Sequence, residues 1–590
     1  MTNGCPPDAL LPQLLQYRAA TTPDRRAYVF LGERGDEEAV LTDGELHRQA
    51  MVTAAELAVR CAPGDRALLL FPPGLDFIVA FFACLYAGVV AVPVNPPRHG
   101  RLGTSTHGIA ADCQPAAVLS PWSMFDEVKA MLPRAGASGA GYWVPVGPAG
   151  DRLPGLAGTP AGAPAFRWAP PAPDSIAFLQ YTSGSTAHPK GVMVSHGNLL
   201  ANERMIARAF GHDQDSTVVG WAPVFHDQGL IGNVLQPLYV GATCVLMSPM
   251  TFARWPLRWL AAVSRYRAHT SGGPNFAYDA CVDRAARGPV HDDLDLSSWR
   301  VAFNGAEPVR PGTLRRFAET FAPYGFRAEA LYPCYGLAEA TLLVTGSRKD
   351  RGARTLEVDP AELGRSRGRP VPSGQGRTLA GSGEIMPDDD VQIVDPATAE
   401  QRAEGEVGEI WVGGPHVTRG YWRNQEATAA AFGARSPDLP GRRYLRTGDL
   451  GFTADGELYV VGRLTDLVII RGRNYYPQDI EETVAAAHRA LRPVGCAAFA
   501  VAAPDGDQLV VIQEVNPGEA ARSGSADIVD AIRAALVREH QVAAADLVLT
   551  LPGQLRKTSS GKIMRRAARE RYEAAEFQRW PAVRTPSVPA

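Results

Sequence analysis

Apolar residues occur in two kinds of run along the first 450 residues, and the two kinds alternate. Residues 77–94, FIVAFFACLYAGVVAVPV, show both: an apolar helix that ends near Gly88, and then a β-branched strand. Residues 176–181, IAFLQY, are a second continuous apolar strand. Alternating buried helices and strands are typical of sheets that helices cover on both faces. The sequence therefore predicts an α/β fold with mostly parallel sheets packed against helices.

Residues 77–94 also suggest a membrane span, because they are uncharged over a sufficient length. The glycine at position 88 and the proline at position 93 favour a buried helix, a turn and a buried strand instead. We therefore expect no integral membrane association.

A change of pattern near residue 465 predicts a second domain. Within residues 463–473, RLTDLVIIRGR, a polar bend leads into a new apolar strand. Residues 477–491 and 528–540 beyond it are amphipathic at helical spacing. We expect an N-terminal domain over residues 1–465, a hinge at Asp466, a small C-terminal α+β domain over residues 466–580, and a disordered tail over residues 581–590.

Two stretches lack this apolar periodicity. Residues 134–173 are rich in Gly, Ala and Pro and indicate irregular surface chain, with a strand at GYWVPV. Residues 347–380 carry seven arginines and few large apolar side chains. We expect the second stretch to be irregular too.

Composition restricts the classes of function. The chain has 590 residues, 45% hydrophobic and 21% charged, which is ordinary for a protein of two or more domains. A formal net charge of -3 argues against a general nucleic-acid binder. The eight cysteines lie far apart without a CxxC pair, which indicates neither a zinc cluster nor a disulfide framework. A reducing cytoplasm fits this pattern best.

Candidate chemistry begins directly after the strand at residues 176–181. Residues 180–192, QYTSGSTAHPKGV, combine hydroxyls, glycines and one lysine. Glycines allow tight turns whose N–H groups face an anion, hydroxyls donate to phosphate oxygens, and a lysine adds a mobile positive charge. A flexible Ser/Gly-rich turn is the plain alternative. The loop predicts a polyphosphate site, with these candidates: Thr182, Ser183, Gly184, Ser185, Thr186 and Lys190.

Further motifs follow in a fixed order. They are WAPVFHDQGL (221–230), NGAEPV (304–309), YGLAEAT (335–341), YLRTGDLG (444–451), GRLTDLVIIRGRNYYPQDIE (462–481) and KTSSGKIMR (557–565). With the phosphate loop, this order resembles the adenylate-forming superfamily over nearly the whole chain. The superfamily includes acyl-CoA synthetases and the adenylation domains of peptide synthetases. Within it, the motifs look most like those of the fatty acyl-AMP ligases.

The resemblance implies a reaction in two steps. A fatty acid carboxylate attacks the α-phosphorus of ATP and releases pyrophosphate, and the acyl adenylate then passes its acyl group to a thiol. Because nucleophile and electrophile are both anionic, the first step needs positive charge. The resemblance further implies Mg²⁺ between the phosphates, held by Glu339, and a phosphate grip that includes Lys190.

The resemblance also implies a nucleoside site. Asp449 matches the carboxylate that accepts the ribose hydroxyls, and Arg463 matches a basic residue near the ribose. Tyr335 would stack on adenine. The remaining nucleotide-binding candidates are Asn304, Gly305, Ala306, Glu307 and Gly336. Each has a plain structural alternative in a turn or a surface ion pair, so these roles depend on the set.

Three further groups follow from the same resemblance. Lys562 matches the lysine that the C-terminal domain brings to the acyl carboxylate and α-phosphate. His226 matches a histidine near the entrance of the acyl pocket, where we expect it to position substrate. The acyl site is expected around Asp227, Gly229, Pro274, Phe276 and Tyr278, whose aromatic members are equally consistent with plain core.

The acceptor thiol is the remaining choice. Fatty acyl-AMP ligases carry an insertion after the YGLAEAT motif that limits the approach of the C-terminal domain to the pose that serves coenzyme A, and residues 347–380 occupy that place. We therefore expect transfer to the phosphopantetheine of a separate acyl carrier protein, in lipopeptide, polyketide or related lipid biosynthesis. The alternatives are a fatty acyl-CoA synthetase and a non-catalytic nucleotide-binding paralogue. The retained charges at Lys190, Glu339, Asp449, Arg463 and Lys562 speak against the second.

Overall fold

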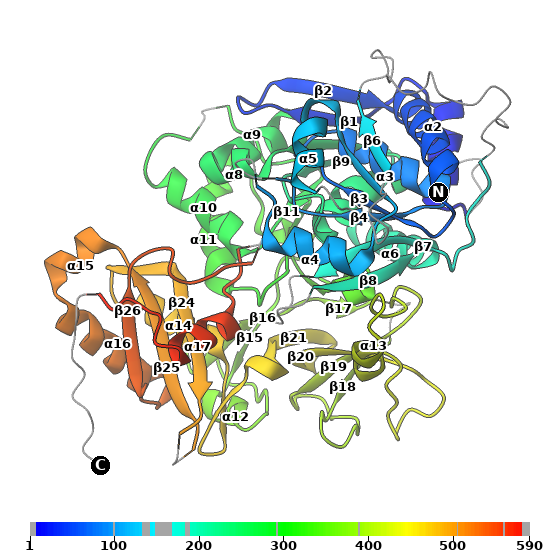
Figure 1. Ribbon diagram of the computed structural model, residues 1–590. Coiled ribbons are helices and arrows are strands. Elements are labelled where there is room, and N and C mark those ends of the chain that lie inside the picture. The colour runs from blue at the N-terminus through cyan, green and yellow to red at the C-terminus, as the bar shows by residue number, and fades with distance from the viewer. Residues whose placement is uncertain are drawn as a thin grey trace, which may run out of the picture.

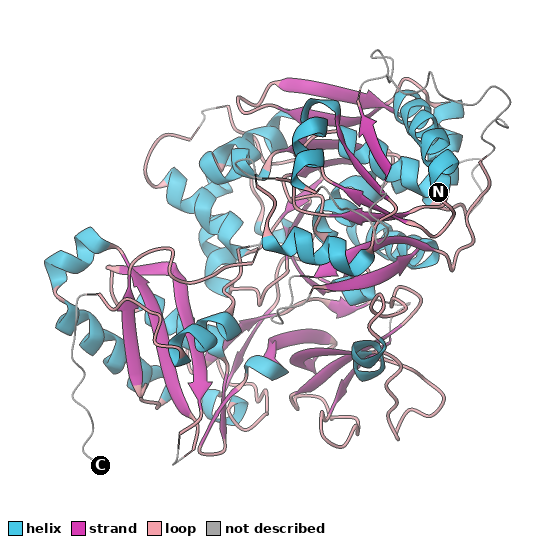
Figure 2. Ribbon diagram, in the orientation of Figure 1, coloured by secondary structure: helices cyan, strands magenta, loops and turns pink. Residues whose placement is uncertain are grey.

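The computed structural model is layered, with helices and sheets alternating in its larger part (Figures 1 and 2). It describes residues 8–97, 101–132, 142–147, 168–182, 189–290, 293–386, 390–503, 506–558 and 561–580. The expected disordered tail and most of residues 134–173 lie outside these ranges. The strand expected at GYWVPV is present as β6 (Tyr142–Val146).

A six-stranded sheet forms the first layer of strands, in the order β6-β5-β3-β4-β7-β8. All its pairings are parallel except β7 with β8, which run antiparallel on either side of the phosphate loop. Its other strands are β3 (Arg66–Leu69), β4 (Val90–Pro93), β5 (Ala117–Pro121), β7 (Ile176–Thr182) and β8 (Lys190–Ser195).

A 13-stranded sheet forms the second layer of strands. One half pairs β1 (Arg26–Leu31), β10 (Thr243–Met247), β9 (Thr217–Gly220), β11 (Thr270–Gly272), β12 (Val301–Asn304) and β13 (Leu331–Gly336) in parallel, in that order. Parallel neighbours end at one edge of a sheet, so the loops after β9, β11, β12 and β13 are brought together there.

The helix between the two sheets confirms the reading of residues 77–94. Helix α3 (Asp76–Ala87) is buried at every position from Phe77 onwards, and Gly88 ends it in the left-handed conformation with φ of 69°. Strand β4 follows at once. Among the described residues, no helix is long and apolar enough to cross a membrane. The α/β fold expected from the sequence is confirmed.

Other helices cover the outer faces of both sheets. Apolar side chains of α4 and α5 pack on the outer face of the six-stranded sheet, and those of α8 to α11 pack on the outer face of the larger sheet. The helices of this part are α1 (Leu11–Thr21), α2 (Asp43–Arg60), α4 (Thr104–Cys113), α5 (Phe125–Met131), α6 (His196–Phe210), α7 (Gln236–Val240), α8 (Pro249–Arg254), α9 (Leu257–Arg265), α10 (Asn275–Ala285) and α11 (Pro311–Phe321).

The other half of the large sheet is antiparallel, which the sequence did not predict. From β13 it continues through β14 (Leu343–Gly346), β17 (Glu384–Ile385), β21 (Glu457–Arg463), β20 (Leu445–Ala454), β19 (Gly408–Gly413) and β18 (Asp390–Val394). Helix α13 (Gln425–Ala431) lies beside it. Antiparallel neighbours here place Asp449 directly opposite Arg463.

The candidate insertion, residues 347–380, is not irregular, contrary to expectation. Strands β15 (Thr355–Val358) and β16 (Arg377–Ala380) pair antiparallel, and α12 (Pro360–Leu363) lies between them in the chain. Asp359 caps α12 by accepting from the backbone of Ala361 at 2.8 Å. Two short strands and one helical turn need few large apolar residues, so composition alone missed them.

The last part of the chain has sheets and cores of its own, coloured orange to red in Figure 1. Strands β24 (Leu491–Val501), β25 (Gln508–Val515) and β26 (Asp546–Thr550) form one sheet, and β22 (Val468–Ile470) pairs with β23 (Arg473–Tyr475). Helices α14 (Pro477–Ala486), α15 (Pro517–Ser523) and α16 (Ser525–His540) cover one face, and α17 (Arg565–Glu573) covers the other. The domain boundary near residue 465 stays a prediction.

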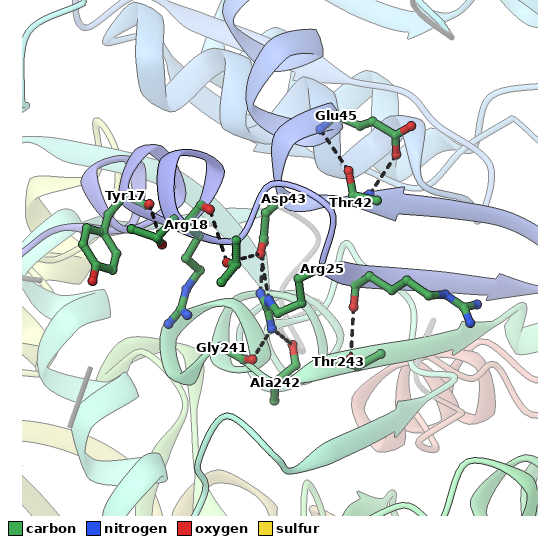
Figure 3. Close-up of polar contacts among 12 residues, drawn as sticks. Tyr17, Arg18, Arg25, Thr42, Asp43, Glu45, Gly241, Ala242 and Thr243 are labelled. Atoms are coloured by element: carbon green, nitrogen blue, oxygen red, sulfur yellow. Dashed lines mark hydrogen bonds and ion pairs between the residues drawn. The ribbon is translucent and has the colours of Figure 1, made fainter. Parts of the chain in front are cut away.

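A buried ion pair fastens the N-terminal helices to the large sheet (Figure 3). The Asp43 carboxylate is fully buried and accepts from Arg25 Nε at 2.7 Å and from Arg25 Nη2 at 2.9 Å. Arg25 also donates to the carbonyl oxygens of Gly241 and, at 3.0 Å, Ala242. One guanidinium therefore joins the start of α2 to the loop before β10.

We expect Asp43→Ala to destabilise this part of the protein by about 3 kcal/mol, because it leaves the partly buried Arg25 without its carboxylate. The matched control is Glu37→Ala, which breaks the exposed pair with Arg26 and should cost less than about 1 kcal/mol. Urea unfolding of both variants measures the difference. Equal losses would contradict the role given to the buried pair.

Candidate functional site

Most candidate residues lie where parallel strands of the large sheet end. The segment with His226 and Asp227 follows β9, Pro274 and Phe276 follow β11, Asn304 ends β12, and Gly336 ends β13. Because β9, β11, β12 and β13 are neighbours in that order, these ends line up along one edge. The antiparallel strands β20 and β21 add Asp449 and Arg463.

The candidate nucleoside corner is a hydrogen-bonded set around Asp449. Its Oδ2 accepts from the Tyr335 hydroxyl at 2.9 Å, and its Oδ1 accepts from Arg463 Nε at 2.9 Å. Burial and the nearby Asp449 charge raise the pKa of Tyr335 well above its usual range. Asp449 raises the pKa of Arg463. The structure thus brings these three expected residues together.

Backbone geometry beside this corner depends on small residues. A Cβ on Gly336 would lie 1.7 Å from the Leu342 carbonyl oxygen, so only glycine fits there. Ala306 has a φ of 73°, a left-handed conformation that alanine adopts at a cost. Its neighbour Gly305 packs against Cys334, whose oxygen and sulfur would each lie 3.0 Å from an added Cβ. The NGAEPV segment is therefore held in one shape.

The candidate phosphate site is described at its two ends. Thr182 ends β7 and pairs with Lys190 at the start of β8. The candidates Ser183, Gly184, Ser185 and Thr186 lie outside the described residues. Lys190 Nζ lies 5.1 Å from the centroid of the Tyr421 ring. The Tyr421 hydroxyl in turn donates to Glu339 Oε1 at 2.8 Å.

Lys562 reaches this edge from the C-terminal part. An added Cβ on its neighbour Gly561 would lie 4.0 Å from the Phe276 ring, so the lysine loop lies against the segment after β11. The Lys562 side chain is exposed to solvent. The surrounding protein, which desolvates the ammonium in part, and the nearby Arg463 lower the pKa of Lys562, while Glu307, Asp227 and Asp449 act in the opposite direction.

Glu307 faces Lys562 from a fixed position. Its Oε1 accepts from the backbone N of Asn275 at 3.1 Å and from Asn275 Nδ2 at 3.0 Å. Asn275 is fully buried, begins α10, and also accepts from Asn304 Nδ2 at 3.2 Å. This asparagine joins the candidate acyl segment to the candidate nucleotide loop.

The candidate acyl residues fall into two groups. Phe276 lies beside Trp221 and Phe252, with ring centroids 5.9 and 6.2 Å apart respectively. Tyr278 is fully buried in the aromatic core, and its hydroxyl donates to the Phe303 carbonyl at 2.7 Å. Pro274 precedes α10 as its N-cap. An acyl role for Tyr278 would therefore require the core around it to open.

The HDQG segment begins a π-helix, Gln228–Leu235, a form of helix that is frequent at functional sites. Asp227 Oδ1 accepts from the Gln228 backbone at 2.7 Å. A Cβ on Gly229 would lie 2.0 Å from the Pro223 carbonyl, so this glycine allows the tight start. The ring centroid of His226 lies 4.8 Å from that of Phe225, and the expected positioning role of His226 stays a prediction.

The expected hinge residue is tied to the lysine loop. Asp466 Oδ2 accepts from Arg565 Nη1 at 2.9 Å, and Arg565 also binds both oxygens of Glu481 at 2.7 Å. Arg565 lies three residues after Lys562 at the start of α17. The position of the lysine loop is therefore linked to the conformation of the hinge.

Comparison with known proteins decides the family. The model of the AMP-binding enzyme family matches residues 15–422, and a second model, the AMP domain of Disco-interacting protein 2-like proteins, matches residues 465–579. The chain belongs to the AMP-binding enzyme family. The medium-chain fatty acid–acyl-carrier-protein ligase JamA of Moorena producens (strain JHB) is 41% identical over 587 residues, 98% of this chain and 97% of JamA.

Solved structures agree. A structure from a study of fatty acyl-adenylate ligases of E. coli and L. pneumophila matches with a TM-score of 0.82 at 31% sequence identity. The match covers 96% of this chain and 99% of the chain in that structure. The fatty acyl-adenylate ligase of L. pneumophila in complex with acyl adenylate and pyrophosphate has a TM-score of 0.71 at 38% identity, with 96% and 97% covered. The resemblance to fatty acyl-AMP ligases is confirmed, and the protein is an enzyme.

Sequence reasoning missed three residues of this AMP-binding enzyme. They are Tyr421, Asn275 and Arg565, which hold Glu339, Glu307 and Asp466 respectively. Arg565 lies inside the motif at residues 557–565 and Asn275 lies between the acyl candidates Pro274 and Phe276, so a search for partners of the expected carboxylates would have found both. Tyr421 stands in GYWRNQ, which showed no feature of a binding loop.

We expect Glu307→Gln to shift the alkaline limit of adenylation to lower pH. Glu307 raises the pKa of Lys562, so removing its charge lets the lysine lose its proton earlier as pH rises. The glutamine keeps an oxygen that accepts from Asn275. The control is Glu319→Gln, an exposed change on α11. Pyrophosphate exchange across the alkaline range measures the effect, and superimposable profiles would refute the electrostatic role of Glu307.

Proposed function

We propose that the protein joins a fatty acid to AMP at the expense of ATP, releases pyrophosphate, and passes the acyl group to the phosphopantetheine thiol of a separate acyl carrier protein. The observation that carries this proposal is the place of Lys562. Its neighbour Gly561 lies against Phe276 of the acyl segment, and the charges of Asp449 and Arg463 in the nucleoside corner act on its ammonium. The fatty acid carboxylate and the α-phosphate of ATP would meet at that junction, next to the Lys562 ammonium.

The first step forms one bond and breaks one. A carboxylate oxygen bonds to the α-phosphorus, and the bond from that phosphorus to the pyrophosphate oxygen breaks. A fatty acid is already ionised at neutral pH, so no general base is required. Lys562 reduces the repulsion between the two anions, and Lys190 balances charge on the departing pyrophosphate. His226 and Phe276 would orient the acyl group.

The residues present fit a magnesium ion. Mg²⁺ is bound by one or two carboxylates together with substrate phosphates, rather than by a cage of protein ligands. Glu339 provides a carboxylate whose Oε1 accepts one hydrogen bond, and the described residues contain no group of three or more candidate ligands. When bound, the ion would neutralise phosphate charge. Glu339 would hold it at the end of the site that Lys190 occupies.

The carrier protein as acceptor rests on the insertion and on the relatives. Arg377 of β16 forms an ion pair with Asp479 of α14, and the Gly364 carbonyl accepts from the Asn474 backbone at 2.9 Å. The insertion therefore touches the C-terminal part directly. JamA is named as an acyl-carrier-protein ligase. Burial, together with Glu482 and Glu481, raises the pKa of Asp479 to about 7. Protonation of Asp479 near neutral pH would therefore weaken its ion pair with Arg377.

The deciding experiment supplies ATP, Mg²⁺ and fatty acids of graded chain length, and then offers coenzyme A and a carrier protein in parallel. The proposal expects fatty-acid-dependent pyrophosphate release, acyl-AMP that accumulates without a thiol, and faster acylation of the carrier protein. Absence of pyrophosphate exchange with every fatty acid would refute adenylation. Equal acylation of coenzyme A would favour a fatty acyl-CoA synthetase.

The cytoplasmic location stays a prediction.

Lys562→Ala separates the two half-reactions. A well-placed cation is worth about 3–4 kcal/mol where charge develops, so adenylation should slow roughly 10²–10³-fold. If the C-terminal part rotates about Asp466 before transfer, Lys562 leaves the site, and transfer from presynthesised acyl-AMP should stay near the wild-type rate. Asp466→Pro restricts φ at the hinge and should impair transfer, with a smaller loss of adenylation from the broken Asp466–Arg565 ion pair. Equal losses in both steps for folded Lys562→Ala would exclude this division.

Asp479→Asn tests the insertion. The change removes the charge that pairs with Arg377 and imitates the protonated carboxyl, so the C-terminal part should leave the insertion more readily. We expect acylation of coenzyme A to rise several-fold relative to the carrier protein. The control is Arg365→Ala, which breaks an exposed pair within the insertion. An unchanged ratio of the two acceptors in Asp479→Asn would count against the insertion as the selective element.

A further inference from the structure

Tyr421 lies between two oppositely charged groups of the proposed site, the Lys190 ammonium and the Glu339 carboxylate. Its hydroxyl donates to Glu339 Oε1 at 2.8 Å, and the Lys190 ammonium lies 5.1 Å from its ring centroid. Lys190 comes from the six-stranded sheet and Glu339 from the turn after β13 of the large sheet. One side chain from a third segment thus contacts both.

The backbone around Tyr421 is fixed from two sides. It forms a β-bridge with Val192, and the Trp422 N–H donates to the Gly191 carbonyl at 2.7 Å, so this segment extends the β8 edge. On the other side, the Tyr421 N–H donates to Thr428 Oγ1 of α13 at 3.0 Å. Gly420 has a φ of 125°, which few other residues adopt.

Packing fixes the ring as well. Tyr421 is 8% exposed, and its ring meets the Phe432 ring edge-on at 5.4 Å and 82°. A tyrosine held in this way cannot follow its partners, so Lys190 and Glu339 must adjust to it. The Glu339 carbonyl is held at the same segment, because it accepts from the Thr418 N–H at 2.9 Å.

Separation of the two charges is the functional consequence. Within the described residues, no ion pair joins Lys190 to Glu339, although both contact Tyr421. A direct pair would leave neither charge available for a phosphate or a cation. The aromatic face attracts the ammonium, by about 0.5–1 kcal/mol at exposed sites, without neutralising it. The hydroxyl orients the carboxylate without removing its charge.

We propose that Tyr421 is a positioning residue that sets the spacing between the metal-binding carboxylate of Glu339 and the phosphate-binding ammonium of Lys190. This inference rests on the proposed function. It assigns the hydroxyl to the Mg²⁺ side and the ring to the pyrophosphate side of one site. Two substitutions can therefore separate its two contributions.

Tyr421→Phe removes only the hydroxyl. We expect this variant to need several-fold more Mg²⁺ for half-maximal pyrophosphate exchange, with the KM for ATP at saturating Mg²⁺ changed by less than about twofold because the ring remains under Lys190. Tyr421→Leu removes the ring as well. It should also raise the KM for ATP several-fold. Binding of Mg²⁺ with pyrophosphate, measured by calorimetry, should weaken in the same order.

Tyr266→Phe is the matched control, because it also removes a tyrosine hydroxyl that donates to a carboxylate, Glu37 Oε1 at 2.7 Å, but contacts neither Lys190 nor Glu339. It should keep the wild-type Mg²⁺ and ATP dependence. The inference is overturned if Tyr421→Phe matches the wild type in both Mg²⁺ dependence and calorimetry, or if Tyr266→Phe reproduces its defect. If Tyr421→Leu does not fold, Tyr421→Phe decides alone. A wild type without pyrophosphate exchange refutes the proposed function, whereas calorimetry still tests the position of Tyr421.

Discussion

The charges that surround the Lys562 ammonium are the interaction on which the candidate site depends. Lys562 belongs to the last part of the chain, yet the charges that act on its pKa belong to the larger part: Arg463, Glu307, Asp227 and Asp449. Three of these four are anions, but burial and Arg463 outweigh them, because the pKa of Lys562 is lowered. A bound carboxylate and phosphate would supply the further negative charge that favours the ammonium form.

Other residues fix three carboxylates of the candidate site. Glu307 is bound by the buried Asn275, Asp449 by Tyr335 and Arg463, and Glu339 by Tyr421. These supporting residues come from different strand ends of the large sheet, from the antiparallel strands, and from the segment beside β8. Arg377 joins residues 347–380 to the C-terminal part through Asp479, and within that part Arg565 ties the lysine loop to Asp466 and Glu481. The rigid sheet edge and the attached lysine loop are thus stabilised by separate sets of ion pairs.

The sequence predicted those features that depend on local pattern. Helix α3, the turn at Gly88 and strand β7 follow from continuous apolar runs, and motif order indicated the family. The antiparallel half of the large sheet could not be predicted in this way, because short strands such as β17 are defined by pairing and not by their own residues. Tyr421 was missed for a related reason. Its importance lies in the partners that folding brings to it, and GYWRNQ alone carries no sign of them.

The central claim is that the observed arrangement makes acyl-AMP and must change before transfer. A covalent bridge between the insertion and the C-terminal part tests this claim most directly. Asn474 Nδ2 donates to Ser366 Oγ at 2.9 Å, so cysteines at these two positions would lie within reach of a short cross-linking reagent. The doubly substituted protein, bridged by a short bifunctional thiol reagent, should form acyl-AMP at the wild-type rate and transfer it poorly, whereas the single variants treated alike should do both. Transfer at the wild-type rate in the bridged protein, or loss of adenylation, would contradict the account.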